Sequence, residues 1–454
     1  MIIILFNIII LGIGIYTIKN FNIGFFLTLL VKILIPSVVR FQIGGFSLNS
    51  TDFFYLFLIC SFIINRPYRN IKMPQTIKYF ILINVISTFI FILFSSRIVP
   101  YSYQFYSFFK GYLFQTYLYI LLGFYASQNI RIKQFNNTII YTSLLCGIYG
   151  LFTYVIKQNP YIDSISLIYS GEISKYSSFI EEVRGGIEGR ISGTMSHPLQ
   201  WGQYWNILIA YLCLFRKQTN KYLWTITIIL GIINIVLCGS RTAIITFIIT
   251  AIFFGGSFSF KTLLKYFTIS YISLIFITSF TSVTNQTKGI ATYIQSALFF
   301  WDSSYSEKAG IVGSSTDMRS KQLETAIDIM LQNPIGGVGY NYQYYVLEKD
   351  ISTDLLGFES IVFKKLAEQG ILSLFLFLFT FNLLRLYVIH RQNLRKSDKW
   401  IINGYFISFL ASILLTGIQG SSWIFFLCLF FLYINNYNKR KNDFQNHLPL
   451  LAQQ

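Results

Sequence analysis

Apolar stretches long enough to cross a membrane follow one another along most of this chain, and this succession limits the possible fold most strongly. The sequence offers about 12 or 13 such stretches, against the roughly 20 apolar residues that a membrane-spanning helix needs. With 54% hydrophobic and only 12% charged residues, a soluble chain of 454 residues has no way to hide its apolar surface. We therefore expect an all-α integral membrane protein. The candidate spans are residues 2–18, 21–39, 53–65, 79–95, 106–126, 138–156, 198–215, 222–238, 242–257, 265–283, 364–388, 400–417 and 422–436.

Basic residues gather in short segments between these stretches, as they do at cytoplasmic membrane edges. The segments alternate so consistently with the spans that all can be cytoplasmic at once, which also puts the C-terminus inside. The formal net charge of +18 then indicates contact with anionic lipid, and no nucleic acid. The segments are Arg66–Lys78, Arg131–Lys133, Arg216–Lys221, Lys261–Lys265, Arg385–Lys399 and Lys439–Lys441.

Two long polar loops face the opposite, extracytoplasmic side, and loops of this length usually carry function. They divide the chain into six expected parts. These are an N-terminal transmembrane bundle (1–156), a first extracytoplasmic loop (157–197), central transmembrane helices (198–283), a large extracytoplasmic loop (284–363), C-terminal transmembrane helices (364–436) and a cytoplasmic tail (437–454), which is polar and expected to be disordered from Asn442 onward.

The second loop contains a segment, 314–340, whose pattern predicts a short amphipathic helix ended by Asn333-Pro334 and a glycine-rich turn. Its first apolar-face residue, Arg319, lies near the positive end of the helix dipole, which suits an anionic ligand. Snorkelling, or an ion pair with a loop carboxylate, explains this arginine equally well. The capping residues are Ser315, Thr316 and Asp317, the inward face is Arg319, Leu323, Ala326, Ile327 and Met330, and the turn holds Gly336, Gly337 and Gly339.

The first loop ends in a stretch where Arg184 and Arg190 are separated by glycines. Glycines let backbone N–H groups approach an anion, and the planar arginine fork suits phosphate oxygens. A solvated hairpin whose arginines pair with the neighbouring glutamates fits the same pattern.

A third arginine, Arg241, lies in a very short turn between two spans, Cys238–Ala243. A charge tethered there is costly unless it faces a cavity, a partner or the lipid headgroups. Arg190, Arg241 and Arg319 come from three parts of the chain but share one predicted membrane face. Together they favour a lipid-linked phosphate or pyrophosphate as ligand.

Two residues are candidates for acid–base chemistry on the same face. Glu359 lies just before a span and is the better candidate for a general base than Glu368, which lies just inside it. A solvated glutamate, or one paired with Lys364, fits the position of Glu359 at least as well. His197 precedes Pro198 at the junction of loop and span, where it fits a base or an ordinary interfacial residue. No metal-ligand set and no nucleotide-binding motif stands out.

Four segments resemble the family of O-antigen polymerases and O-antigen ligases, the multispan glycosyltransferases of bacterial surface polysaccharide assembly. They lie between about residues 185 and 375, and their order and spacing match the family together with the span pattern. The segments are Gly189–Pro198, Gly239–Ala243, Arg319 followed by Asn333–Gly339, and Ala367–Gly370.

The resemblance implies a substrate, a glycan on undecaprenyl pyrophosphate presented at the outer face of the bacterial inner membrane. An acceptor hydroxyl would attack the anomeric carbon, while Arg190, Arg241 and Arg319, with Arg184, hold the leaving pyrophosphate. Glu359 or His197 would take the proton, and the scheme requires no cofactor or metal. The family also suggests a chain-length regulator and a flippase as protein partners.

The resemblance leaves the acceptor open. Ligases of the family, which transfer polymer to the lipid A core, typically carry a histidine late in the large loop, whereas residues 354–368 contain no histidine and offer Glu359. This difference favours a polymerase, which joins glycan to glycan. A flippase for the lipid-linked unit would have charges inside its spans and short outer loops. Here Lys32 and Lys110 are the main charges in the spans, and the outer loops are long.

Overall fold

The computed structural model describes most of the chain, and helices make up nearly all of the described part. The residues described are 2–35, 40–43, 46–65, 73–96, 98–168, 183–184, 187–195, 197–216, 219–255, 292–297, 304–305, 316–348, 358–391, 396–417 and 420–451.

The N-terminal half consists of long helices separated by short connections. One of them changes its winding on the way, because α5, the π-helix η1 and α6 form one continuous rod. The elements are α1 (Ile2–Lys19), α2 (Phe21–Leu34), α3 (Ser50–Asn65), α4 (Gln75–Leu93), α5 (Tyr101–Ser107), η1 (Phe108–Leu118), α6 (Tyr119–Asn129), α7 (Ile132–Ile156) and the short α8 (Pro160–Ile168).

The C-terminal half has the same character and adds the helices of the large loop. Its elements are α10 (Pro198–Leu214), α11 (Lys221–Leu237), α12 (Arg241–Gly255), α16 (Thr316–Gln332), α17 (Tyr342–Glu348), α18 (Ile361–Arg391), α19 (Lys396–Thr416) and α20 (Ser422–Leu451).

Two small antiparallel hairpins accompany the helices, and the all-α prediction otherwise holds for the described residues. The first pairs β1 (Arg40–Ile43) with β2 (Phe46–Asn49), and the second pairs β3 (Val183–Arg184) with β4 (Ile187–Glu188). Both lie in connections that the charge pattern assigns to the outer side, so within the described residues the strands lie outside the predicted spans. Strands of two to four residues are too short to show a period-2 hydrophobic pattern.

Four helices in the described part are long and apolar enough to cross a membrane, namely α4, α7, α18 and α19. Five shorter apolar helices accompany them: Phe21–Leu34, Thr51–Asn65, Lys221–Leu237, Arg241–Phe254 and Ser422–Asn436. Together they make the chain an integral membrane protein of helical architecture. The predicted span 265–283 lies outside the described residues.

Local sequence signals explain where several helices begin. The side-chain oxygen of Asn20 accepts a hydrogen bond from the backbone N–H of Asn22 at 3.0 Å, and Asn220 does the same for Tyr222 at 2.9 Å. These bonds cap α2 and α11 by occupying N–H groups that have no partner within the helix. Prolines precede α4 and α5, which suits positions where a helix needs no backbone donor.

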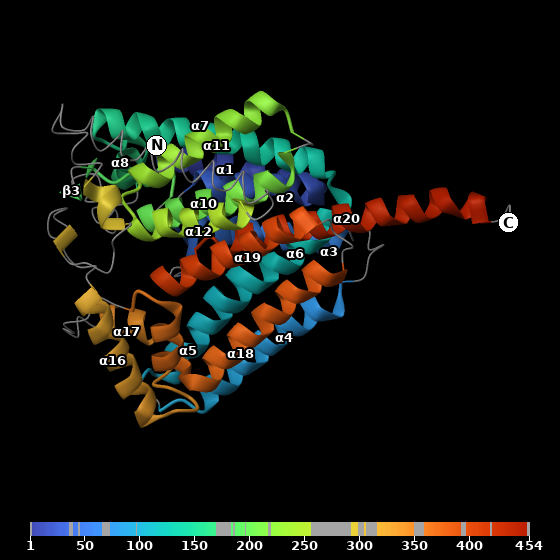
Figure 1. The fold of residues 1–454 in the computed structure, drawn as a ribbon. Coiled ribbons are helices and arrows are strands. Elements are labelled where there is room, and N and C mark those ends of the chain that lie inside the picture. Colours follow the sequence, from blue (N-terminus) through green and yellow to red (C-terminus); the bar gives the residue numbers. More distant parts are fainter. Residues whose placement is uncertain are drawn as a thin grey trace.

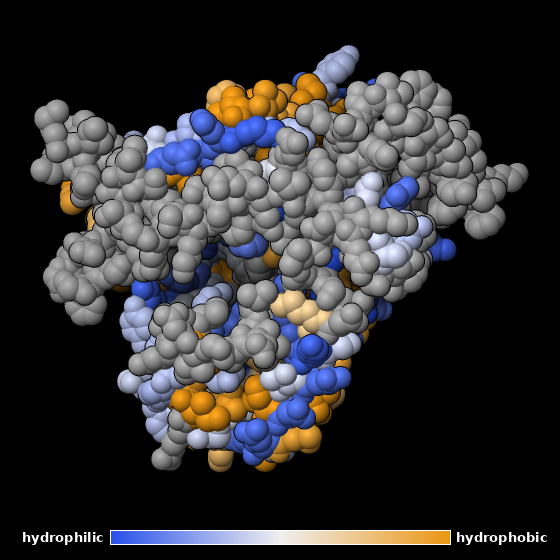
Figure 2. Space-filling view, turned by 90° about the vertical axis from the view of Figure 1, so that its left-hand side faces the viewer, coloured by the Kyte–Doolittle hydropathy of each residue, from blue (hydrophilic) through white to orange (hydrophobic). Residues whose placement is uncertain are grey.

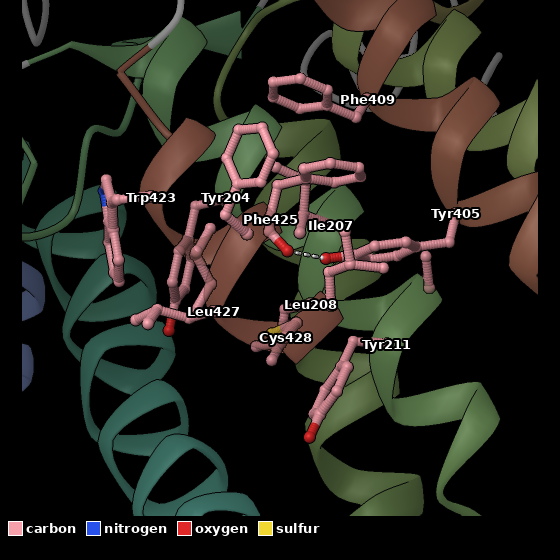
Figure 3. Packing of buried hydrophobic residues seen from close by; sticks show 14 of the residues in the cluster. Tyr204, Ile207, Leu208, Tyr211, Tyr405, Phe409, Trp423, Phe425, Leu427 and Cys428 are labelled. Atoms are coloured by element: carbon pink, nitrogen blue, oxygen red, sulfur yellow. Dashed lines mark hydrogen bonds between the residues drawn. The ribbon is translucent and has the colours of Figure 1, made fainter. Parts of the chain in front are cut away.

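The centre of the fold is formed by α10 and the first part of α20, whose side chains are buried on every side. Figure 3 shows them interlocking: Phe425 of α20 stacks on Tyr405 and Phe409 of α19, and Tyr204 of α10 stacks on Trp423. A helix that is apolar all round belongs in the interior. The segment that leads into α10 is therefore anchored to a deeply buried part of the molecule.

The N-terminal helices enclose a cluster of charged and polar side chains around Lys32. The ammonium group hydrogen-bonds the hydroxyl of Tyr55 and lies 4.5 Å from the ring centre of Tyr119 and 5.3 Å from that of Trp423. Asp52, only 1% exposed, acts on Lys32 through its charge. The cluster joins α2, α3, α6 and α20, so this charge inside a predicted span has a structural explanation.

The elements of the two long loops gather at one end of the helix bundle. In Figure 1, α8, β3, α16 and α17 lie at the left, while the last part of α20 projects from the opposite end. Figure 2 looks onto the loop end and shows hydrophilic surface in the recess between its upper and lower halves. The expectation that the chain is disordered from Asn442 is wrong up to Leu451, because α20 continues to that residue.

Candidate active site

The predicted loop helix is α16, Thr316–Gln332, but a different face of it packs against the protein. Leu323 and Ile327 are each 37% exposed, whereas Gln322 and Ala326 are both 0% exposed. The face that packs on α18 therefore includes a polar residue, Gln322. The predicted apolar face is therefore right for Ala326 and wrong for Leu323 and Ile327. Arg319 remains close to the packed side.

After α16, the glycine-rich turn pairs with a break in α18. Gly370 leaves the helical conformation with φ +75°, and the backbone groups exposed there bond to the turn. Val338 donates its N–H to the oxygen of Ala367 at 2.9 Å, and Ile371 donates to Pro334 at 3.1 Å. The Asn333–Gly339 and Ala367–Gly370 motifs thus form one unit that fixes α16 to α18.

The buried side chain of Glu368 also stabilises the contact between the turn and α18. Its side chain is 2% exposed, accepts backbone hydrogen bonds from Asn341 and Gln343, and lies 4.0 Å from the ammonium group of Lys364. The carboxylate thus holds the start of α17. Burial raises the pKa of the neighbouring Tyr340, with smaller contributions from Tyr112 and Glu368, so this phenol stays neutral.

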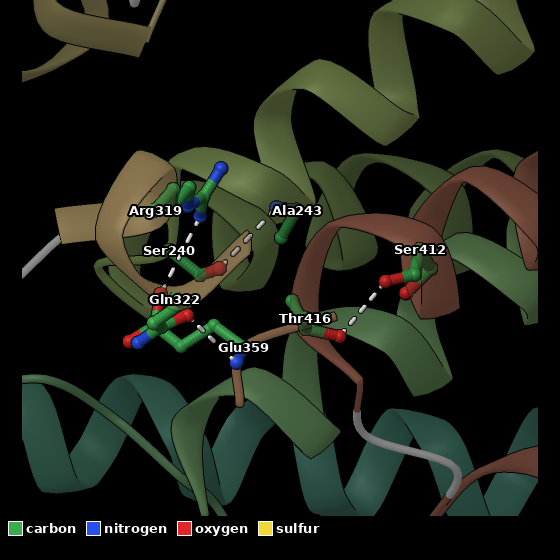
Figure 4. Close-up of polar contacts among 7 residues, drawn as sticks. All are labelled: Ser240, Ala243, Arg319, Gln322, Glu359, Ser412 and Thr416. Atoms are coloured by element: carbon green, nitrogen blue, oxygen red, sulfur yellow. Dashed lines mark hydrogen bonds and ion pairs between the residues drawn. The ribbon is translucent and has the colours of Figure 1, made fainter. Parts of the chain in front are cut away.

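Two of the predicted site residues meet beside the joint between the glycine-rich turn and the break in α18. The guanidinium Nη2 of Arg319 lies 3.6 Å from the carboxylate of Glu359, and the two side chains are 28% and 35% exposed. Gln322, one turn after Arg319, accepts the backbone N–H of Glu359 at 3.1 Å. Figure 4 shows the three residues together. Helix α16 thus contacts both the main chain and the carboxylate of Glu359.

The end of α19 supports the same segment from another side. Gly417, with φ +64°, is so close that an added Cβ would lie 3.1 Å from the oxygen of Phe358 and 3.2 Å from the nitrogen of Ser360. These residues flank Glu359. Its backbone is therefore enclosed between α16 and α19, and its carboxylate remains accessible.

Arg190 packs on the turn between α11 and α12. Its side chain is 3% exposed, and its Nε donates to the oxygen of Cys238 at 3.3 Å. A Cβ on Gly239, which has φ +62°, would lie 2.7 Å from the Cγ of Arg190. The backbone of Ile191 also donates to Leu237 at 3.2 Å. Glycine is thus required at the position where the buried arginine crosses the turn.

Arg241 begins α12 directly after this turn. Contacts of α10 place the start of α12 next to the end of α19. On α10, Asn206 donates to the oxygen of Ala243 at 2.9 Å, and Gln203, one turn away, donates to Ser412 of α19 at 3.0 Å. The start of α12 and the end of α19 therefore meet on the same face of α10. Figure 4 shows this junction beside Arg319 and Glu359. Three predicted arginines thus lie at one end of the fold.

The two remaining predicted site residues are His197 and Arg184. The Nδ1 of His197 accepts the backbone N–H of Leu199 at 3.0 Å, which makes this histidine the N-cap of α10. Arg184 lies in the β3–β4 hairpin opposite Ile187, and its side chain is outside the described part. The described contact of His197 is thus a structural one within its own helix.

The comparison with protein families bears on the segment that contains most of this site. Residues 226–378 match the model of the O-Antigen ligase family. This segment is an O-antigen ligase domain. The domain indicates transfer of a lipid-linked glycan of the O-antigen polymerase or ligase type, and members of this family are glycosyltransferase-like membrane proteins. No curated protein matches the chain.

The O-antigen ligase domain contains Arg241, Arg319 and Glu359, while Arg190 comes from the segment before it. The expected family resemblance is confirmed. Gln322 could not be singled out from the sequence, because a glutamine on an amphipathic helix carries no charge or motif. Its position one turn after Arg319 was the one available signal.

Proposed function

We propose that this chain is a polymerase of undecaprenyl-pyrophosphate-linked oligosaccharide repeat units. A hydroxyl of the acceptor sugar attacks the anomeric carbon of the donor, and a new glycosidic bond forms. The bond from that carbon to the pyrophosphate oxygen breaks, and undecaprenyl pyrophosphate leaves with the electron pair. The hydroxyl proton passes to a base on the protein. The product is a longer glycan, as in O-antigen, capsule or exopolysaccharide.

The pyrophosphate ligands in this proposal are Arg190, Arg241 and Arg319, with Arg184 on the neighbouring hairpin. The first two are connected by the α11–α12 turn, and Arg319 approaches from the helix of the large loop. Charge that is already in place when the leaving group becomes more negative lowers the barrier without further rearrangement. The burial of Arg190 supports this role, because buried charge acts in a low dielectric.

Glu359 is the proposed general base. Its backbone is fixed by Gln322 and by the end of α19, while its carboxylate stays 35% exposed and can reach a ligand. The ion pair with Arg319 carries the proposal, because it joins a base and a pyrophosphate ligand inside the matched domain. His197 is less well supported, since capping α10 through Nδ1 leaves catalysis to Nε2.

The absence of a histidine from residues 354–368 favours a polymerase over a ligase. In a ligase the acceptor is the lipid A core, and the pyrophosphate site is unchanged. A flippase is disfavoured, because the predicted spans carry few charges and the predicted outer loops are long.

The proposed function also implies a subcellular localisation. We assign the chain to the bacterial inner membrane with about 12 or 13 spans and the site on the extracytoplasmic side, since the basic segments mark the cytoplasmic side. Helices α16 and α17 would then face the lipid-linked substrate at the outer leaflet. The family resemblance suggests a chain-length regulator and a flippase as protein partners in the cell.

A gel of the surface glycan and of the lipid-linked pool from a deletion strain tests the proposal. A polymerase defect leaves single repeat units on the lipid A core, without a ladder. Bare core, with long polymer retained on undecaprenyl pyrophosphate, identifies a ligase. Repeat units trapped on the cytoplasmic leaflet identify a flippase and contradict the arginine site.

A further inference from the structure

Gln322 is held in one orientation at the centre of the site. It is 0% exposed, and its Oε1 accepts the backbone N–H of Glu359 at 3.1 Å. A backbone N–H only donates, so the amide oxygen must face it and the amide nitrogen must face away. The amide cannot rotate by 180° without losing this bond. The two hydrogens of Nε2 are therefore presented on the side of the amide away from the backbone of Glu359.

Nothing in the described part of the chain accepts these hydrogens. The Nε2 of Gln322 is closed to solvent and has no hydrogen-bond partner there, and the same holds for the Nε of Arg319. Buried donors without acceptors are rare in proteins. Here two of them stand one turn apart on α16, next to the Arg319–Glu359 pair. Both groups are donors, so they call for the same kind of ligand atom, an oxygen with free lone pairs.

We propose that Gln322 binds the donor substrate, with Nε2 donating to a non-bridging oxygen of the pyrophosphate that Arg319 holds. This inference rests on the proposed function and adds a neutral ligand to the arginines. A neutral amide suits this position, because it contacts the anion without adding a charge beside the base, Glu359. Non-bridging phosphate oxygens accept several hydrogen bonds, so the Nε of Arg319 and the Nε2 of Gln322 can share one phosphate.

The ligand reaches this place when Arg319 turns. The arginine side chain is 28% exposed, so it can leave the carboxylate of Glu359 for an incoming anion. The bond from the backbone of Glu359 to Gln322 is independent of that movement. The base thus keeps its position while its ion-pair partner is exchanged for the substrate.

The test measures inorganic pyrophosphate binding to the purified full-length protein in detergent by calorimetry. Gln322→Glu keeps an oxygen for the backbone of Glu359 but replaces the donor by a negative charge. Gln322→Met removes both hydrogen bonds at similar size. Gln332→Glu adds the same charge at an exposed position of α16 and serves as control. Thermal unfolding of each variant reports separately on the fold.

We expect Gln322→Glu to weaken pyrophosphate binding at least tenfold and Gln322→Met about tenfold, with Gln332→Glu within about twofold of the unchanged protein. Unchanged binding in Gln322→Glu, combined with loss of binding in Arg319→Ala, overturns the inference and leaves the arginine site standing. No binding by the unchanged protein, or full binding by Arg319→Ala, contradicts the arginine site and this inference together.

Discussion

Gly370 lies against Pro334 so closely that a Cβ on residue 370 would stand 2.2 Å from the Pro334 carbonyl oxygen. No side chain fits at that distance, and φ +75° is itself unfavourable for other residues. This contact closes the joint between the glycine-rich turn and the broken helix α18. The joint in turn sets Arg319 opposite Glu359, so glycine at position 370 is a requirement of the site.

Gly370→Ala is therefore expected to destabilise the loop end of the protein by at least about 2 kcal/mol and to abolish chain elongation. The backbone strain of an alanine at positive φ and the collision of its Cβ with Pro334 both raise the free energy of the folded state. Thermal unfolding in detergent and a glycan gel measure the two effects. The matched control is Gly12→Ala in α1, where an added Cβ meets nothing within 4 Å. An active Gly370→Ala protein contradicts this role of the joint.

Glu359→Gln separates catalysis from stability. The ion pair with Arg319 is partly exposed, so its loss is expected to cost less than about 1 kcal/mol. Loss of a general base is expected to slow elongation by about 100-fold or more. Initial rates with purified lipid-linked repeat units measure the change. Glu324→Gln, exposed on the same helix α16, is the control. A Glu359→Gln rate within a few-fold of the unchanged protein excludes Glu359 as the base.

The Lys32 cluster predicts strong coupling between two substitutions. Lys32→Met leaves the buried Asp52 without its countercharge and is expected to cost about 3–5 kcal/mol. Adding Asp52→Asn removes the uncompensated charge, and Gln115, which donates to Asp52 at 2.7 Å, can still bond to the amide oxygen. The double variant is then expected to be more stable than Lys32→Met. Additive losses in thermal unfolding would contradict this explanation.

Chelation tests whether the arginines supply the charge that the leaving pyrophosphate needs. Because Arg190, Arg241 and Arg319 belong to the protein itself, we expect elongation by the purified protein to continue at an unchanged rate in excess EDTA. The rate in a buffer with added magnesium is the comparison. A loss of activity in EDTA that magnesium restores would show that a metal ion shares this role.

Much of the fold could be predicted because its signals are local. Apolar length located the helices, and Asn333-Pro334 located the end of α16 within one residue. The packed face of α16 could not be predicted, since Leu323 and Ile327 look buried by hydrophobicity alone. Gln322 is buried there because it bonds to Glu359, a contact between distant residues. Only the tertiary fold defines that face.

In the candidate site, too, some features could be predicted from local sequence and others depend on tertiary contacts. Arg190, Arg241 and Arg319 could be singled out from the sequence, because arginines in the polar segments between apolar spans are conspicuous. The structural role of His197 was hidden, because an N-cap bond depends on backbone geometry. The tie between the glycine-rich turn and Gly370 was hidden too. Each motif reads as an ordinary turn until the break in α18 exposes backbone groups that bond to it.

The most direct test of the polymerase proposal uses the purified full-length protein in lipid vesicles with undecaprenyl-pyrophosphate-linked repeat units as the only glycan. We predict a ladder of growing chains, one undecaprenyl pyrophosphate released for each bond formed, and no ladder with Arg319→Ala. Repeat units that remain single until lipid A core is added, and are then transferred to it, would contradict the polymerase and establish a ligase.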